Sequence, residues 1–138
     1  MIKNESYKTF YPNSTPMPSI EIEISSLNKN KKMSIIAGID TGYDGNLIIP
    51  MEIFNNLNLK SSALPIDLSS HGITATGEHV ELFSAFANIN IPGLIEDIEL
   101  EIDSFNSCLF PLAGRQLLSI LIAKFHGPEQ SSEFSVDI

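Results

Sequence analysis

An apolar run ends in an acidic turn at residues 35–42, which read Ile35-Ile36-Ala37-Gly38-Ile39-Asp40-Thr41-Gly42. Short β-branched runs bounded by glycine-containing turns are typical of buried strands. A carboxylate at the end of such a strand is costly to ionise unless it has a partner. Thr41 adds a hydroxyl that can hydrogen bond within the turn, and Gly42 allows a close approach of the backbone. The segment therefore predicts a strand that delivers the carboxylate of Asp40 into a tight turn.

Further strands are predicted on both sides of this turn. Residues 20–24 alternate strictly between isoleucine and glutamate, which predicts a half-buried strand that forms a hairpin with the strand at residues 33–39. After the turn, residues 47–49 predict another short strand. Pro50 suits the first turn of a helix, and apolar residues with helical spacing follow it as far as residue 57. We expect a helix of about two turns there.

The second half of the chain predicts more strands and a second short helix. Residues 80–91 and 94–102 predict two long strands that are joined by the turn Pro92-Gly93. Residues 108–110 predict a further strand, and residues 115–122 predict a helix. The side chains expected on the wet face of the strand at 94–102 and just beyond it are Asp97, Glu99, Glu101 and Asp103. Many short strands with two short helices predict an all-β domain.

Length and composition limit the class of protein. The chain has 138 residues, 43% of them hydrophobic, which is enough for one domain with a core. Its 8 Lys+Arg against 17 Asp+Glu give a net charge of −9, which disfavours a nucleic acid or an anionic membrane as a partner. Cys108 is the single cysteine, and no apolar run approaches the roughly 18 residues of a membrane span or forms the core of a secretory signal. We therefore expect a cytoplasmic protein without disulfides.

Composition also divides the chain into three parts. Residues 1–18 are polar and contain three prolines, so we expect an irregular N-terminal arm. Residues 19–126 hold the predicted strands and helices and form the domain. Residues 127–138 begin with Gly127-Pro128 and continue with a polar run, which predicts a tail or an edge strand.

The order of these features resembles the retropepsin-like aspartic proteases, above all their small prokaryotic members. The apolar strand, Asp40-Thr41-Gly42 and the following strand and helix match the first motif of the family, and Leu112-Ala113-Gly114-Arg115-Gln116-Leu117-Leu118 is similar to its second motif. Tyr43 departs from the pattern, because retroviral members have a small residue there. The resemblance covers residues 19–122 and implies a closed, barrel-type β domain with two short helices that acts as a homodimer.

The resemblance implies an aspartic endopeptidase in which Asp40 is the catalytic residue. Such enzymes need two carboxylates that share one proton. This chain has one Asp-Thr-Gly and is too short for two lobes, so the resemblance implies that each subunit of a two-fold dimer contributes one Asp40. No metal or other cofactor is implied. The expected partners are a peptide or protein substrate and a second copy of the chain.

The resemblance also assigns supporting roles around the catalytic turn. Thr41 and Gly42 are expected to hold the loop, with the Thr41 hydroxyl bonding across the two-fold axis. Arg115 is the single arginine and follows Gly114, and it is expected to form a bidentate ion pair with Asp44 that braces the loop.

A glycine-containing stretch between the two motifs lies where the family has its flap. Residues 69–80 are expected to form a mobile hairpin that covers the substrate. The candidate substrate-binding residues in it are Ser70, His71, Gly72, Ile73, Thr74 and Gly77.

Other chemistries fit the sequence less well. The turn at residues 40–46 has Asp, Asp and Gly at EF-hand positions one, five and six, but Gly42 replaces the third ligand and Met51 the final glutamate. It also resembles the phosphate loop of actin-like ATPases, whose folds need a much longer chain. No Gly-x-Ser-x-Gly occurs, and no metal-ligand spacing relates His71, His79 and His126. One alternative stays open, namely a retropepsin-like dimerisation or peptide-binding module with weak or no protease activity.

Overall fold

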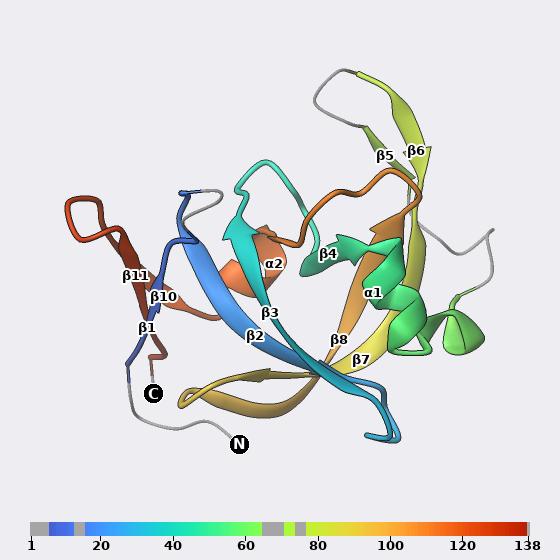
Figure 1. The fold of residues 1–138 in the computed structure, drawn as a ribbon, viewed down its shortest axis with the longest axis horizontal. Helices are drawn as coiled ribbons and strands as arrows, with labels where there is room; N and C mark the ends of the chain where they lie inside the picture. Colours follow the sequence, from blue (N-terminus) through green and yellow to red (C-terminus); the bar gives the residue numbers. More distant parts are fainter. Residues whose placement is uncertain (1–5, 13–15, 65–70, 74–76, 138) are drawn as a thin grey trace.

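Six strands close into a barrel in the computed structural model, which describes residues 6–12, 16–64, 71–73 and 77–137 (Figure 1). The strand order is β2-β3-β9-β4-β8-β7, and β7 pairs with β2 to complete the barrel. The strands are β2 (Ser19–Ser25), β3 (Lys32–Ile39), β4 (Leu47–Pro50), β7 (Phe83–Ile91), β8 (Ile95–Phe105) and β9 (Leu112–Ala113). The predicted all-β architecture is therefore confirmed.

The first hairpin follows the alternation of its sequence. β2 and β3 pair antiparallel from Ser19 opposite Gly38 to Ser25 opposite Lys32. The side chains of Ile20, Ile22 and Ile24 are fully buried in the core, while the glutamates between them are half-buried. Apolar residues at every second position therefore set the register, because a slip by one residue would turn all three isoleucines towards water.

Two parallel strand pairs bring the candidate motifs to one end of the barrel. β3 runs parallel to β9, with Ile39 opposite Ala113, and β4 runs parallel to β8. Neighbouring parallel strands end at the same edge of a sheet. Asp40, which follows β3, and Gly114, which follows β9, therefore leave the barrel side by side.

Among the described residues, two short α-helices and a 3₁₀ helix complete the domain. α1 (Met51–Asn56) begins directly after Pro50, as predicted, and buries Phe54; the 3₁₀ helix η1 (Leu59–Ser62) follows it. α2 (Arg115–Leu118) is shorter than the helix predicted over 115–122, because the chain turns at residues 119–120 and enters a strand at residue 122. None of the helices in the described residues has the length and apolarity needed to cross a membrane.

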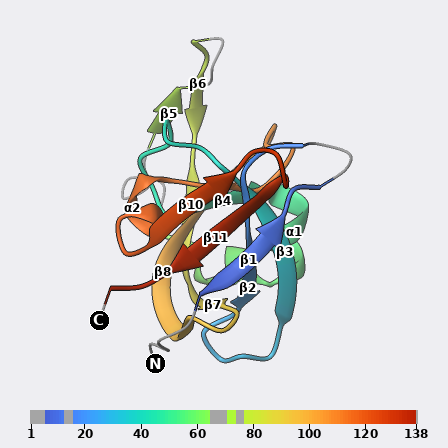
Figure 2. The ribbon, with the colours of Figure 1, turned by 90° about the vertical axis from the view of Figure 1, so that its left-hand side faces the viewer.

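A separate three-stranded sheet joins the two ends of the described chain (Figure 2). Its order is β1 (Tyr7–Phe10), β11 (Ser131–Ser135) and β10 (Ile122–His126), all antiparallel. The expectation of an irregular arm is therefore wrong for β1, and β11 is a central strand instead of an edge. β1 forms despite the polar composition of residues 1–18 because it pairs with β11, which is remote in the sequence. Phe134 of β11 is fully buried and belongs to the core. The domain boundaries themselves stay a prediction.

Two other segments differ from their predictions. Residues 108–110 form a loop, in which the Leu109 side chain is 85% exposed, because the chain turns after β8 before it enters β9. The long strand predicted over 80–91 is interrupted at Leu82. The residues before the break form β6 (His79–Glu81), which pairs with β5 (His71–Ile73) instead of joining the barrel.

Candidate active site

Asp40 opens a tight turn at the end of β3. Its backbone N–H donates to the Ala113 carbonyl at 3.0 Å, so the neighbouring strand β9 holds the start of the turn. The N–H of Gly42 donates to Asp40 Oδ1 at 2.9 Å, and the N–H of Tyr43 donates to the Asp40 carbonyl at 3.2 Å. These bonds orient a half-buried carboxylate at the mouth of the barrel.

The second motif holds the rest of this loop through its backbone. Three successive amides at the start of α2 donate to three loop carbonyls. The bonds run from Gly114 to Asn46 (2.9 Å), from Arg115 to Tyr43 (2.8 Å) and from Gln116 to Gly45 (3.1 Å). The first amides of a helix have no partner within the helix, and here the loop supplies their acceptors. The two motifs are therefore one backbone unit.

Gly114 lies against the loop so closely that no side chain fits. A Cβ there would come within 2.3 Å of the Gly45 carbonyl oxygen and 2.7 Å of the Tyr43 carbonyl oxygen. It would also lie 2.5 Å from Tyr43 Cδ2. Real Cβ atoms do not approach other atoms at such distances, so glycine is required by close packing at this position.

Tyr43 reaches from the loop to the outer face of the barrel. Its hydroxyl donates to Asp103 Oδ2 on β8 at 2.5 Å, and Ser84 Oγ on β7 donates to Asp103 Oδ1 at 2.7 Å. Burial, and then the negative charges of Asp103 and Glu101, hold the pKa of Tyr43 well above its usual range. The phenol therefore stays protonated and acts as a donor.

Asp103 corrects the prediction of a solvent-facing acidic strand. Its side chain is 8% exposed, whereas Asp97 and Glu99 on the same strand are exposed. The alternation along β8 places Asp103 on the face opposite the buried Ile102, as expected, but the loop at residues 40–46 and Tyr43 lie over that face at Asp103. Local sequence does not reveal the burial of Asp103, because the tyrosine that bonds to it is 60 positions away.

Asp44 and Arg115 form the expected ion pair across the two motifs. The contact joins Arg115 Nη2 to Asp44 Oδ1, and the two side chains are 60% and 79% exposed, respectively. Charge pairs in contact with solvent contribute little to stability. The bidentate geometry and the bracing role of this pair stay predictions.

Thr41 differs from its expected role within the turn. Its side chain is exposed, and with the described residues of this chain it makes no side-chain hydrogen bond. The turn is closed instead by the Gly42 amide and the Asp40 carboxylate. The predicted bond across a two-fold axis involves a second subunit and stays a prediction.

The predicted flap contains an antiparallel strand pair. β5 and β6 align His71 with Glu81 and Ile73 with His79. The pair extends beyond the barrel at the end where the loop after β3 emerges (Figure 1). Gly77, which lies two residues before β6, is exposed and adopts a φ of 85°, a conformation that favours glycine. Ser70 and Thr74 lie outside the described residues.

Cysteine and metal chemistry find little support in the described part of the chain. Burial raises the pKa of the Cys108 thiol, whose Sγ donates to the Phe110 carbonyl at 3.5 Å. A thiol with a raised pKa is a poor nucleophile at neutral pH. Among residues 6–12, 16–64, 71–73 and 77–137, no three His, Cys, Asp or Glu side chains are grouped so that they could hold a metal ion.

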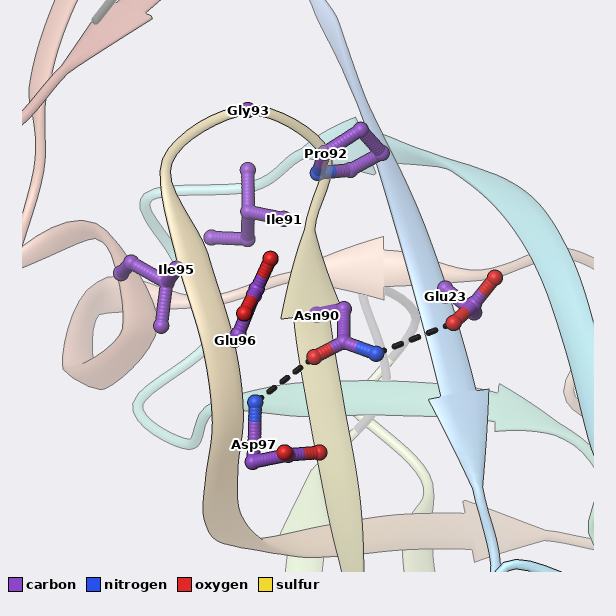
Figure 3. Close-up of a pocket in the computed structure, with 8 residues that line it drawn as sticks. All are labelled: Glu23, Asn90, Ile91, Pro92, Gly93, Ile95, Glu96 and Asp97. Atoms are coloured by element: carbon purple, nitrogen blue, oxygen red, sulfur yellow. Dashed lines mark hydrogen bonds between the residues drawn. The ribbon is translucent and has the colours of Figure 1, made fainter. Parts of the chain in front are cut away.

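A surface pocket lies at the other end of the barrel, around the turn between β7 and β8 (Figure 3). Its polar groups already bond to one another: Asn90 Nδ2 donates to Glu23 Oε1 at 2.9 Å, and the Asp97 N–H donates to Asn90 Oδ1 at 2.7 Å. The β7–β8 turn and the loop after β3 lie at opposite ends of the molecule (Figure 1). This pocket is therefore separate from the candidate active site.

A search of solved structures finds a match to the EIAV protease complexed with the inhibitor HBY-793. The TM-score is 0.52 at 20% sequence identity, and the match covers 80% of this chain and 92% of that chain. The fold is similar to that of a retroviral protease. No protein-family model matches the chain, and a search of curated proteins found no match. The likeness shows a retropepsin-like fold, as the sequence motifs predicted.

Proposed function

We propose that the protein is an aspartic endopeptidase. The observation that carries this proposal is the position of Asp40, half-buried at the mouth of the barrel in a loop held through its backbone by residues 113–116. A rigid frame around an accessible carboxylate is what acid–base chemistry on a bound substrate requires. The similarity of the fold to a retroviral protease supports the same conclusion.

The reaction needs two carboxylates with one proton between them. The ionised carboxylate removes a proton from a water molecule, which attacks the scissile carbonyl carbon. The protonated carboxylate donates its proton to the carbonyl oxygen, and the leaving amine is protonated when the C–N bond breaks. Two acids held at close range titrate as a pair, so we expect a bell-shaped pH dependence with its optimum below neutrality.

A second copy of the chain is the proposed source of the second carboxylate. Asp44, in the same loop, already pairs with Arg115, so the proposal does not assign the second carboxylate to it. An isologous two-fold interface would bring one Asp40 from each subunit to the axis. β10 offers a surface for such contact, because it is an edge strand on which Ile122 and Phe125 are 45% and 52% exposed.

The test is cleavage of a mixed peptide library, followed by mass spectrometry from pH 3 to pH 8. We expect the wild type to cleave and Asp40→Asn to lose on the order of 10²–10⁴-fold in rate, because its amide can neither accept nor donate the required proton. Asp137→Asn is the matched control, since it makes the same change at an exposed aspartate near the end of the described chain. Cleavage that survives in Asp40→Asn would refute the proposed catalytic residue.

The dimer is tested by the dependence of activity on protein concentration. Specific activity should fall on dilution through the dimer dissociation constant, and sedimentation should show the matching change in mass. Full specific activity in a proven monomer would contradict the shared site. Peptide binding without turnover, unchanged by Asp40→Asn, would instead favour a peptide-binding module with this fold.

A further inference from the structure

The side chains of Tyr43, Asp103 and Ser84 are joined by hydrogen bonds into a continuous polar chain. This polar chain is additional to the backbone bonds between the two motifs. Asp103 accepts one hydrogen bond on each carboxylate oxygen, from the Tyr43 hydroxyl at 2.5 Å and from Ser84 Oγ at 2.7 Å. Asp103 is 8% exposed and Ser84 is fully buried. The polar chain therefore runs from the candidate catalytic loop, through β8, to β7.

Ser84 lies at the base of the flap hairpin. It is the second residue of β7, and the single residue Leu82 separates β7 from β6, the returning strand of the hairpin. Its carbonyl also accepts the N–H of Leu64 at 2.7 Å, and Leu64 is the last residue described before β5. Ser84 thus contacts the segment that leads into the hairpin and adjoins the segment that leads out of it.

We propose that Asp103 and Ser84 are positioning residues that couple the flap hairpin to the catalytic loop through Tyr43. This proposal rests on the proposed function and on the predicted role of the hairpin as a flap over a substrate bound at Asp40. A buried carboxylate needs a donor for each oxygen, and losing either donor leaves a costly unpaired group. Loss or displacement of the Ser84 hydroxyl therefore leaves one oxygen of Asp103 without its donor, and acts through Asp103 on the Tyr43 hydroxyl and the loop that carries it.

Amide hydrogen exchange in the full chain tests the coupling without relying on activity. Ser84→Ala removes one donor to Asp103 and touches no atom of the loop. We expect exchange of the hydrogen-bonded amides in residues 40–46, which are those of Asp40, Gly42 and Tyr43, to become about tenfold faster, because the loop opens locally more often. Tyr43→Phe keeps the aromatic ring and should produce the reciprocal effect in residues 79–84.

Ser104→Ala is the matched control. Ser104 is also fully buried and lies next to Asp103 on β8, but its Oγ donates to the Ile49 carbonyl at 2.6 Å and takes no part in the polar chain. Exchange in residues 40–46 should match the wild type in this variant. In the double variant Tyr43→Phe/Ser84→Ala, the effect on loop exchange should not exceed the larger single effect, because both changes break the same connection.

Loop exchange within about twofold of wild type in Ser84→Ala, or an equal acceleration in Ser104→Ala, would overturn the proposal. Tyr43→Phe tests the coupling from the other end, so the result does not depend on how well Ser84→Ala folds. Where the wild type shows Asp40-dependent cleavage, Ser84→Ala should lower kcat severalfold and Ser104→Ala should not. Absence of cleavage by the wild type would refute the proposed function alone, while the exchange data would still decide the coupling.

Discussion

Two strand–turn–helix segments meet at the end of the barrel, and each contributes different groups to the candidate site. The first runs from β3 through the loop at residues 40–46 and β4 into α1, and its turn presents the Asp40 carboxylate. The second runs from β9 through Gly114 into α2, and its turn presents backbone amides. Within the loop at residues 40–46 the first segment supplies carbonyl acceptors, and residues 114–116 of the second segment supply the amide donors that bond to them. One segment thus carries the proposed chemistry, and the other holds it in place.

The two helices show how this difference between the segments arises. α1 follows Pro50, which has no N–H to satisfy, and it serves the core by burying Phe54. α2 begins directly after Gly114, so the unpaired amides of its first turn lie against the loop and bond to it. Similar patterns of strand, turn and short helix therefore place different groups at the site, because the turn residues differ.

Replacing the glycine of the supporting segment should have the largest effect. Gly114→Ala places a Cβ against two loop carbonyls and the Tyr43 ring, so the loop must move away and its bonds to residues 114–116 must stretch. We expect a loss of about 3 kcal/mol in the free energy of unfolding, measured by urea titration. Gly127→Ala is the control, since no atom lies within 4 Å of its Cβ position. Equal stability of the two variants would show that the segments are not packed as described.

Tyr43, in the first segment, should affect how the free energy of unfolding falls at alkaline pH. The pKa of Tyr43 is raised in the native state by burial, so above about pH 10 the unfolded chain loses this proton while the native chain keeps it. The contribution of Tyr43 to the free energy of unfolding is fully present below that pH, and it declines above that pH by about 1.4 kcal/mol per pH unit. Urea titrations between pH 8 and pH 12 should therefore show a shallower decline in Tyr43→Phe than in the wild type.

Tyr7 provides the comparison for that measurement. A hydrogen bond to Glu21, with burial, raises the pKa of Tyr7 to about 12, so Tyr7→Phe should also flatten the decline above pH 10. The double variant should be flatter than either single one, because the two tyrosines lie in different parts of the molecule. A Tyr43→Phe curve parallel to that of the wild type would contradict a buried, protonated phenol.

The side-chain link between the two segments should have the smallest effect on stability. Arg115→Lys keeps the charge beside Asp44 and loses the planar guanidinium, and both partners are exposed. We expect the free energy of unfolding to change by less than about 1 kcal/mol. A loss of activity much larger than this change in stability would support the predicted bracing role, whereas unchanged stability and activity would refute it.

The local sequence pattern was sufficient to predict the structure wherever neighbouring residues determine it. The buried isoleucines of β2, the hairpin with β3, the start of α1 after Pro50 and the placement of Asp40 after a buried strand all follow from side-chain period and turn chemistry. The pairing of the two motifs was predicted from their resemblance to a family, and the backbone bonds between them agree with it.

Contacts between remote segments decided the remaining features. Tyr7–Phe10 became a strand because β11 lies beside it, and Asp103 became buried because Tyr43 covers it from the loop at residues 40–46. Periodicity reports on which face of a strand a side chain lies, but it does not report on what covers that face. The acid that we propose as catalytic was therefore visible in the sequence, while the polar chain that we propose to position it exists only in the folded molecule.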